Sequence, residues 1–84
     1  MSGEYKMQDI RIYSKDYCPY CKAAKILLTN NGFNFEEIDV AKQPARLHEM
    51  VSLSGRRTVP QIFFGNGYVG GYDDLVGFFQ FEVA

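Results

Sequence analysis

A strand, a helix and a second strand follow one another in the first half of the chain, and this order constrains the fold more than any other feature. Residues 10–13 alternate as a strand does. The segment that opens at residues 18–19 and ends at residues 30–32 places its apolar side chains on one helical face. A second alternating segment begins at Phe33 and runs to about Asp39. Strands joined in this way pair in parallel with a right-handed crossover, so we expect a β-α-β unit.

The second half of the chain predicts a helix, a hairpin and a last helix. Pro44 favours the start of the helix, and Gly55 favours its end. The hairpin strands are residues 61–64 and 68–70, which add antiparallel pairing to the same sheet. Asp73 is a good N-cap for the last helix. The predicted class is therefore α/β, with a four-stranded mixed sheet and three helices in the order β-α-β-α-β-β-α.

Length and charge limit the classes of function. The chain of 84 residues predicts a single domain over residues 1–84, with residues 1–8 as a loose N-terminal arm. The net charge of −1 does not indicate a nucleic-acid partner. No apolar run approaches the roughly 18 residues that suggest a membrane span, and the start of the chain lacks the apolar region of a secretory signal. We therefore expect a cytoplasmic protein in a reducing compartment.

The two cysteines of the chain lie together in Cys18-Pro19-Tyr20-Cys21. A disulfide between them closes so short a loop that it stabilises the fold little, and it would not persist as a structural bond in a reducing compartment. Redox chemistry, metal binding or coincidence remain as explanations. Structural zinc needs four ligands, and His48 is the only histidine, so we expect no metal.

The position of the cysteines favours redox chemistry, because such a pair at the start of a helix that follows a strand is typical of a redox motif. A helix N-terminus stabilises an anion, and Lys15 and Lys22 flank Cys18. Both effects favour the thiolate, which is the form that attacks disulfides. Cys21 lies one turn inside the helix, so we expect it to be more buried, less acidic and suited to a resolving role.

A second segment of interest is Thr58-Val59-Pro60-Gln61, whose proline directly precedes the third strand. A proline at the mouth of a strand removes one ladder hydrogen bond. We predict a cis bond between Val59 and Pro60, which would turn the Val59 backbone outward to pair with an extended peptide. The alternative is an edge-strand proline with no role in function.

A third segment, Gly70-Gly71-Tyr72-Asp73-Asp74, leads directly into the last helix. Glycines let a ligand approach the backbone, and the helix N-terminus attracts carboxylates. Asp73 is also able to accept a hydrogen bond from an amino group. An ordinary N-cap explains the same residues equally well.

Taken together and in this order, the three segments resemble the glutaredoxin family, with a dithiol active site, a cis-proline loop and a glycine-glycine-x-aspartate-aspartate motif. The resemblance covers the chain from about residue 9 to its end. It implies a thioredoxin fold and a glutathione-dependent thiol–disulfide oxidoreductase in which Cys18 is the nucleophile and Cys21 the resolving thiol. It also implies a monomer that acts on disulfide-containing or glutathionylated proteins, ribonucleotide reductase among them.

The resemblance further implies a glutathione site, with glutathione as co-substrate. The Val59 backbone would pair with the cysteine moiety, the helix start at Tyr72 and Asp73 would hold the γ-glutamyl end, and Lys15 and Tyr20 would line the glycine end. Arg56 and Arg57 add positive charge nearby. Tyr72 stands where the family often has a small residue. The expected glutathione-binding residues are Lys15, Tyr20, Thr58, Val59, Pro60, Gly71, Tyr72 and Asp73.

Two other functions remain as alternatives. A thioredoxin-like reductant fed by a flavoprotein reductase has the same fold, but its signature has Trp before the first cysteine and Gly-Pro between the pair, whereas here Tyr17 precedes Cys18. A dimeric, glutathione-ligated iron–sulfur carrier is the second alternative. Members resembling that role typically lack the second cysteine, which this chain has as Cys21.

Overall fold

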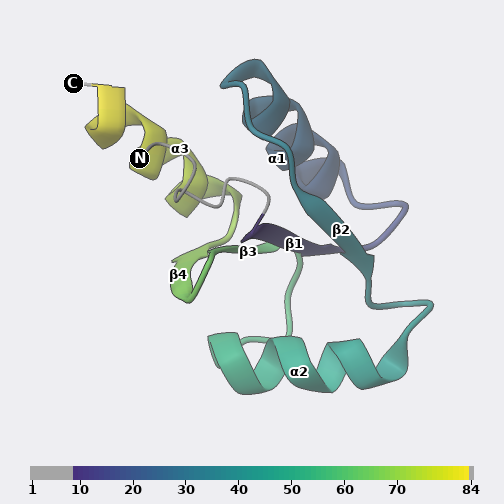
Figure 1. The fold of residues 1–84 in the computed structure, drawn as a ribbon. Coiled ribbons are helices and arrows are strands. Elements are labelled where there is room, and N and C mark those ends of the chain that lie inside the picture. Colours follow the sequence, from purple (N-terminus) through teal and green to yellow (C-terminus); the bar gives the residue numbers. More distant parts are fainter. Residues whose placement is uncertain (1–8, 84) are drawn as a thin grey trace.

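The computed structural model describes residues 9–83, so the predicted N-terminal arm at residues 1–8 lies outside the described residues. Seven elements follow one another in the predicted order (Figure 1). They are β1 (Ile10–Ser14), α1 (Pro19–Asn30), β2 (Glu36–Asp39), α2 (Pro44–Ser54), β3 (Gln61–Phe64), β4 (Gly67–Gly70) and α3 (Tyr72–Val83). No helix in this part of the chain is long and apolar enough to cross a membrane.

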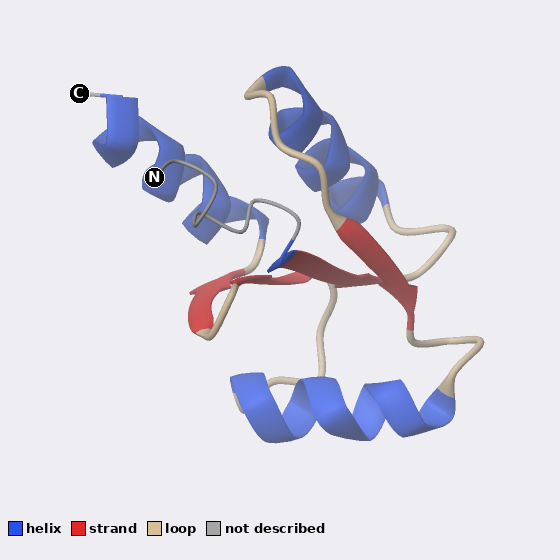
Figure 2. Ribbon diagram, viewed as in Figure 1, coloured by secondary structure: helices blue, strands red, loops and turns tan. Residues whose placement is uncertain are grey.

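The four strands form one mixed sheet in the order β2-β1-β3-β4. β1 pairs in parallel with β2, and β3 pairs antiparallel with both β1 and β4. Helix α2 covers one face of the sheet, while α1 and α3 lie together on the other (Figure 2). The predicted fold class, a four-stranded mixed sheet with three helices, is confirmed.

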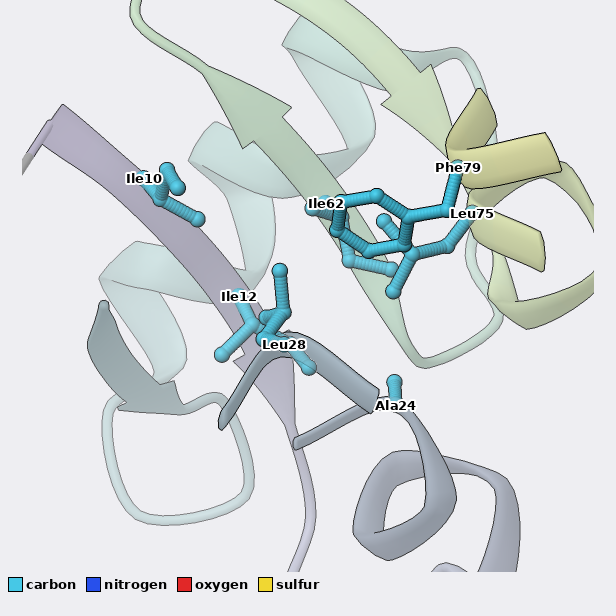
Figure 3. Packing of buried hydrophobic residues seen from close by; sticks show 7 residues of the cluster. All are labelled: Ile10, Ile12, Ala24, Leu28, Ile62, Leu75 and Phe79. Atoms are coloured by element: carbon cyan, nitrogen blue, oxygen red, sulfur yellow. The ribbon is translucent and has the colours of Figure 1, made fainter. Parts of the chain in front are cut away.

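The sheet face toward α1 and α3 carries the larger apolar cluster (Figure 3). Alternation along β1 sends Ile10 and Ile12 to this face, where Ile62 of β3 meets them. The helices contribute the residues at helical spacing. The buried members of the cluster are Ile10, Ile12, Ala24, Leu28, Ile62, Leu75 and Phe79.

The sheet face toward α2 combines an apolar cluster with a polar network. Tyr13 is fully buried against Phe63, with ring centroids 5.7 Å apart. Its hydroxyl donates to Glu49 of α2 and accepts from Arg11 Nη1 at 3.0 Å. Arg46 Nε donates to the same carboxylate at 3.1 Å, and these contacts lower the pKa of Glu49, the Tyr13 hydrogen bond most of all. The network attaches α2 to the sheet.

Strand β2 is shorter than predicted, because it begins at Glu36 and not at Phe33. The alternation at Phe33 and Phe35 reflects packing, since both side chains lie against the α1/α3 cluster. The Phe33 ring stacks on Phe79 with centroids 5.6 Å apart. An alternating pattern therefore marked two half-buried side chains in a loop as well as the strand that follows them.

Helix α3 is not capped as predicted. Tyr72 is its first residue, which places Asp73 inside the first turn, and the cap is made by Asp74. Its carboxylate accepts a hydrogen bond from the Gly71 N–H at 3.0 Å, as the third helical residue does in a capping box. The N-cap position is therefore Gly71, so the assignment of Asp73 as the N-cap was wrong by two residues, and the Asp73 side chain is exposed.

Replacing Asp74 with alanine is expected to lower the free energy of unfolding by about 1 kcal/mol, because the Gly71 N–H loses its acceptor. Asp73→Ala is the control, since it removes the same charge from the same helix turn but neither a recorded hydrogen bond nor the exposed ion pair that Asp74 makes with Arg56. Urea unfolding of both variants measures the difference. Equal losses in the two variants would show that the helix dipole, and not the capping bond, accounts for the effect.

Candidate active site

Cys18 is the N-cap residue of α1, and Pro19 occupies the first helical position. The Cys18 sulfur accepts a hydrogen bond from the Cys21 N–H at 3.2 Å, so the side chain points along the helix axis at its N-terminus. Lys15 contributes its carbonyl oxygen, which accepts from the Cys18 N–H at 3.3 Å. The Cys18 sulfur therefore lies at the N–H groups that begin α1, which carry partial positive charge.

Cys21 lies one turn deeper and is fully buried, with 0% of its surface exposed. Burial first, and then its contact with Cys18, raise the pKa of the Cys21 thiol to about 12. Both cysteines are free thiols. The prediction that Cys21 is buried and weakly acidic is confirmed. Cys18 is partly exposed.

Alkylation with iodoacetamide at neutral pH is expected to place one group on Cys18 and none on Cys21. The raised pKa and the burial keep Cys21 protonated and inaccessible, whereas Cys18 is partly exposed. Intact mass and peptide mapping measure the modification, and the protein unfolded in guanidinium provides the control that takes two groups. Equal labelling of both cysteines in the folded protein would contradict this asymmetry.

The loop before β3 brings Val59 to the active-site sulfur. The peptide bond between Val59 and Pro60 is cis, as predicted. The Val59 carbonyl oxygen lies 3.8 Å from the Cys18 sulfur, although the two residues are 41 positions apart in the sequence. The Val59 backbone therefore stands beside the Cys18 sulfur.

A cleft of about 330 Å³ opens next to this contact. Its walls come from the start of α1, the loop before β3 and the start of α3, three segments that are far apart in the sequence and near one another in space (Figure 1). The predicted site residues that line it are Tyr20, Thr58, Val59, Pro60, Gly71, Tyr72 and Asp73. Of the predicted glutathione-binding residues, Lys15 is the one that does not line the cleft.

The Tyr72 side chain lines the cleft and packs against the ring of Tyr20. Its ring centroid lies 5.9 Å from that of Tyr20, with the ring planes tilted by 38°. Tyr20 is 64% exposed and Tyr72 is half-buried. The two rings form an aromatic wall between the N-termini of α1 and α3, so the cleft remains open although Tyr72 is large.

Three further residues line the cleft without having been predicted as site residues: Arg56, Gln61 and Asp74. Arg56 pairs with Asp74 at 3.7 Å. Gln61 is buried and donates to Thr58. A signal for Gln61 was present in the sequence, because it is a polar residue that opens an otherwise apolar strand directly after a proline.

Among residues 9–83, no three His, Cys, Asp or Glu side chains gather into a group suited to a metal ion. His48 lies exposed on α2, a helix that lies on the opposite face of the sheet from α1 and its cysteines.

Comparison with known proteins gives a consistent result. A sequence model of the family described as Glutaredoxin matches residues 10–69, which include both cysteines and Val59. Glutaredoxin 3 of Escherichia coli (strain K12) is 46% identical over 69 residues, which are 82% of this chain and 83% of that protein. The alignment with Glutaredoxin 3 therefore covers most of each of the two proteins.

Solved structures agree with the sequence comparison. The solution structure of glutaredoxin from Brucella melitensis is 46% identical and superimposes with a TM-score of 0.76, covering 93% of this chain and 85% of that one. The crystal structure of a buckwheat glutaredoxin–glutathione complex is 27% identical, with a TM-score of 0.80 over 88% of this chain and 70% of that one. With its thioredoxin fold and paired cysteines at a helix start, the chain belongs to the glutaredoxin family of thiol–disulfide oxidoreductases.

Proposed function

We propose that the chain is a glutathione-dependent oxidoreductase that reduces glutathione mixed disulfides and protein disulfides, with Cys18 as nucleophile and Cys21 as resolving thiol. The observation that carries this proposal is the position of the cleft. It begins at Val59, whose carbonyl oxygen is 3.8 Å from the Cys18 sulfur, and extends to the N-terminus of α3. The similar fold of a glutaredoxin crystallised with glutathione supports the choice of ligand.

Glutathione is a tripeptide with two carboxylates, one amino group and a central thiol, and the cleft offers groups of matching chemistry. In the proposed pose, its cysteine pairs with the Val59 backbone, which brings the two sulfurs together. The γ-glutamyl carboxylate lies at the N-terminus of α3, where the first N–H groups have no partner within the helix, and the exposed Asp73 accepts from the amino group. Tyr20 lies at the glycine end, and Lys15, which does not line the cleft, adds positive charge that attracts the glycine carboxylate.

The proposed reaction is two successive exchanges. The Cys18 thiolate attacks the glutathione sulfur of a mixed disulfide, the substrate leaves as a thiol, and Cys18 is left joined to glutathione. A second glutathione thiolate attacks the glutathione sulfur of this adduct, which releases glutathione disulfide and restores the Cys18 thiolate. The donor N–H of Cys21 stabilises the negative charge on Cys18 as it departs.

Protein disulfides follow a different second step in this proposal. Cys18 forms a mixed disulfide with the protein, and the Cys21 thiol gives up its proton and attacks the Cys18 sulfur, so the protein leaves fully reduced and the chain holds a disulfide between Cys18 and Cys21. Two glutathione molecules then reduce that disulfide. Burial raises the pKa of the Cys21 thiol, so this step requires the proton to be removed as the attack proceeds.

A turnover assay with glutathione, glutathione reductase and a small glutathione mixed disulfide tests the proposal. We expect NADPH consumption that depends on the protein and on glutathione, and that disappears in Cys18→Ser. Substituting a thioredoxin reductase for glutathione and its reductase separates the alternative of a thioredoxin-like reductant. Turnover with that flavoprotein alone, and none with glutathione, would contradict the proposed function.

A further inference from the structure

We propose that Gln61 is a positioning residue of the active site. With Tyr68 behind it, Gln61 holds the Thr58 carbonyl and thereby sets where the Val59 backbone stands relative to the Cys18 sulfur. The inference rests on the proposed function, because its test uses a glutathione mixed disulfide as substrate. The position of the Val59 backbone should affect any disulfide that reaches Cys18.

Within residues 9–83, the hydrogen bonds found for Thr58 all come from the Gln61 side chain. Its side-chain nitrogen donates to the Thr58 carbonyl oxygen at 3.0 Å and lies 3.2 Å from the Thr58 hydroxyl. Thr58 is itself exposed, and the loop that contains it has no strand partner. The residue that follows it is Val59, so a shift of the Thr58 carbonyl moves the peptide unit next to the Cys18 contact.

Thr58 and Tyr68 together use both polar groups of the Gln61 amide. The Tyr68 hydroxyl donates to Gln61 Oε1 at 2.5 Å. A carbonyl oxygen only accepts, so the amide nitrogen must face Thr58, which leaves the amide oxygen for the Tyr68 hydroxyl. The Tyr68 ring packs on Phe63 with centroids 5.0 Å apart and is held by the β3–β4 pairing. The hydrogen bonds from Tyr68 to Gln61 and from Gln61 to Thr58, called the brace below, therefore connect the edge strand β4 to the active-site loop.

The burial of Gln61 makes its hydrogen bond to Thr58 hard to replace. Gln61 is 1% exposed, so water does not readily replace the bond that its nitrogen gives to Thr58. Tyr68 is 39% exposed, so its hydroxyl is more easily replaced by water. Reactions between two groups depend steeply on their relative placement, and a misplacement of about 1 Å can cost about a hundredfold in rate. We therefore expect Gln61 to matter more than Tyr68 for activity.

Two variants remove the brace with little change in shape. Gln61→Met keeps the length of the side chain and removes both polar groups, and Tyr68→Phe keeps the ring packing and removes one hydroxyl. We expect kcat/KM for a glutathione mixed disulfide to fall about ten- to a hundredfold in Gln61→Met and about two- to tenfold in Tyr68→Phe. Matched controls at exposed positions are Gln80→Met and Tyr17→Phe, which should keep the wild-type value.

A second readout separates positioning from a general loss of structure. Alkylation of Cys18 by iodoacetamide does not use the Val59 backbone, so its rate should stay at the wild-type value in both variants, at a temperature where circular dichroism shows them folded. If Gln61→Met does not fold, Tyr68→Phe decides the question alone. Wild-type kcat/KM in the folded variants, or an alkylation rate that falls together with kcat/KM, would overturn the proposal.

The wild-type protein in the same experiment tests the proposed function independently. A wild type that fails to reduce glutathione mixed disulfides contradicts glutathione dependence, and the variants are then compared on insulin disulfides, for which the same ratios are expected. Wild-type rates of both folded variants on insulin would overturn the role of Gln61, whatever the reductant is.

Discussion

Replacing Cys18 with serine is expected to abolish reduction of both glutathione mixed disulfides and protein disulfides. A hydroxyl is not ionised at neutral pH and does not exchange with a disulfide, and the remaining thiol, Cys21, is buried with a raised pKa. The fold is expected to persist, because serine is a preferred N-cap residue and its oxygen is able to accept from the Cys21 N–H as the sulfur does.

The measurement is a side-by-side assay of the variant and the wild type on a small glutathione mixed disulfide and on insulin disulfides. Circular dichroism and the melting temperature confirm that the variant is folded. Residual turnover above the rate without protein would mean that another residue carries the attack, and the assignment of Cys18 would then be wrong.

Replacing Cys21 is expected to separate the two substrate classes. A glutathione mixed disulfide needs no second protein thiol, because another glutathione releases Cys18, so Cys21→Ser should stay within about threefold of the wild-type rate. Reduction of protein disulfides should be largely lost, because the resolving thiol is missing. Cys21→Ala provides the matched control, since it avoids leaving a buried hydroxyl at a position that is 0% exposed.

The outcome that contradicts the division of roles is equally clear. If both Cys21 variants were as inactive as Cys18→Ser on the glutathione mixed disulfide, Cys21 would be needed in every turnover. If both kept the wild-type rate on insulin, glutathione alone would resolve protein mixed disulfides, and Cys21 would have no resolving role.

The sequence predicted the order of the elements because each has a local signal. Pro44 opens α2 and Gly55 ends it in the left-handed conformation, as expected. The predictions of where β2 and α3 begin were wrong, because in each case one sequence pattern is compatible with two local structures. Phe33 and Phe35 alternate as a strand does, but their contacts with helices decide that they lie in a loop. Asp73 and Asp74 are both suitable caps, and only the position of the first helical turn decides between them.

The active site was predictable in its parts and less so in its connections. The three motifs named most of the residues that line the cleft, and burial of Cys21 followed from its place in the helix. The contacts of Gln61 with Thr58 and Tyr68 were not predictable, because Tyr68 comes from the strand that pairs with β3 and its hydrogen bond depends on register. The same holds for Tyr13 and Glu49, which are 36 positions apart.

Formation of the glutathione adduct tests the central claim most directly. Cys21→Ser is mixed with oxidised glutathione, or with cystine at the same concentration, and the adduct is followed by intact mass and peptide mapping. The account predicts a single glutathione on Cys18, formed much faster than the cysteine adduct, because the cleft recognises the γ-glutamyl and glycine ends that cystine lacks. Equal rates with the two disulfides, or no glutathione on Cys18, would contradict it.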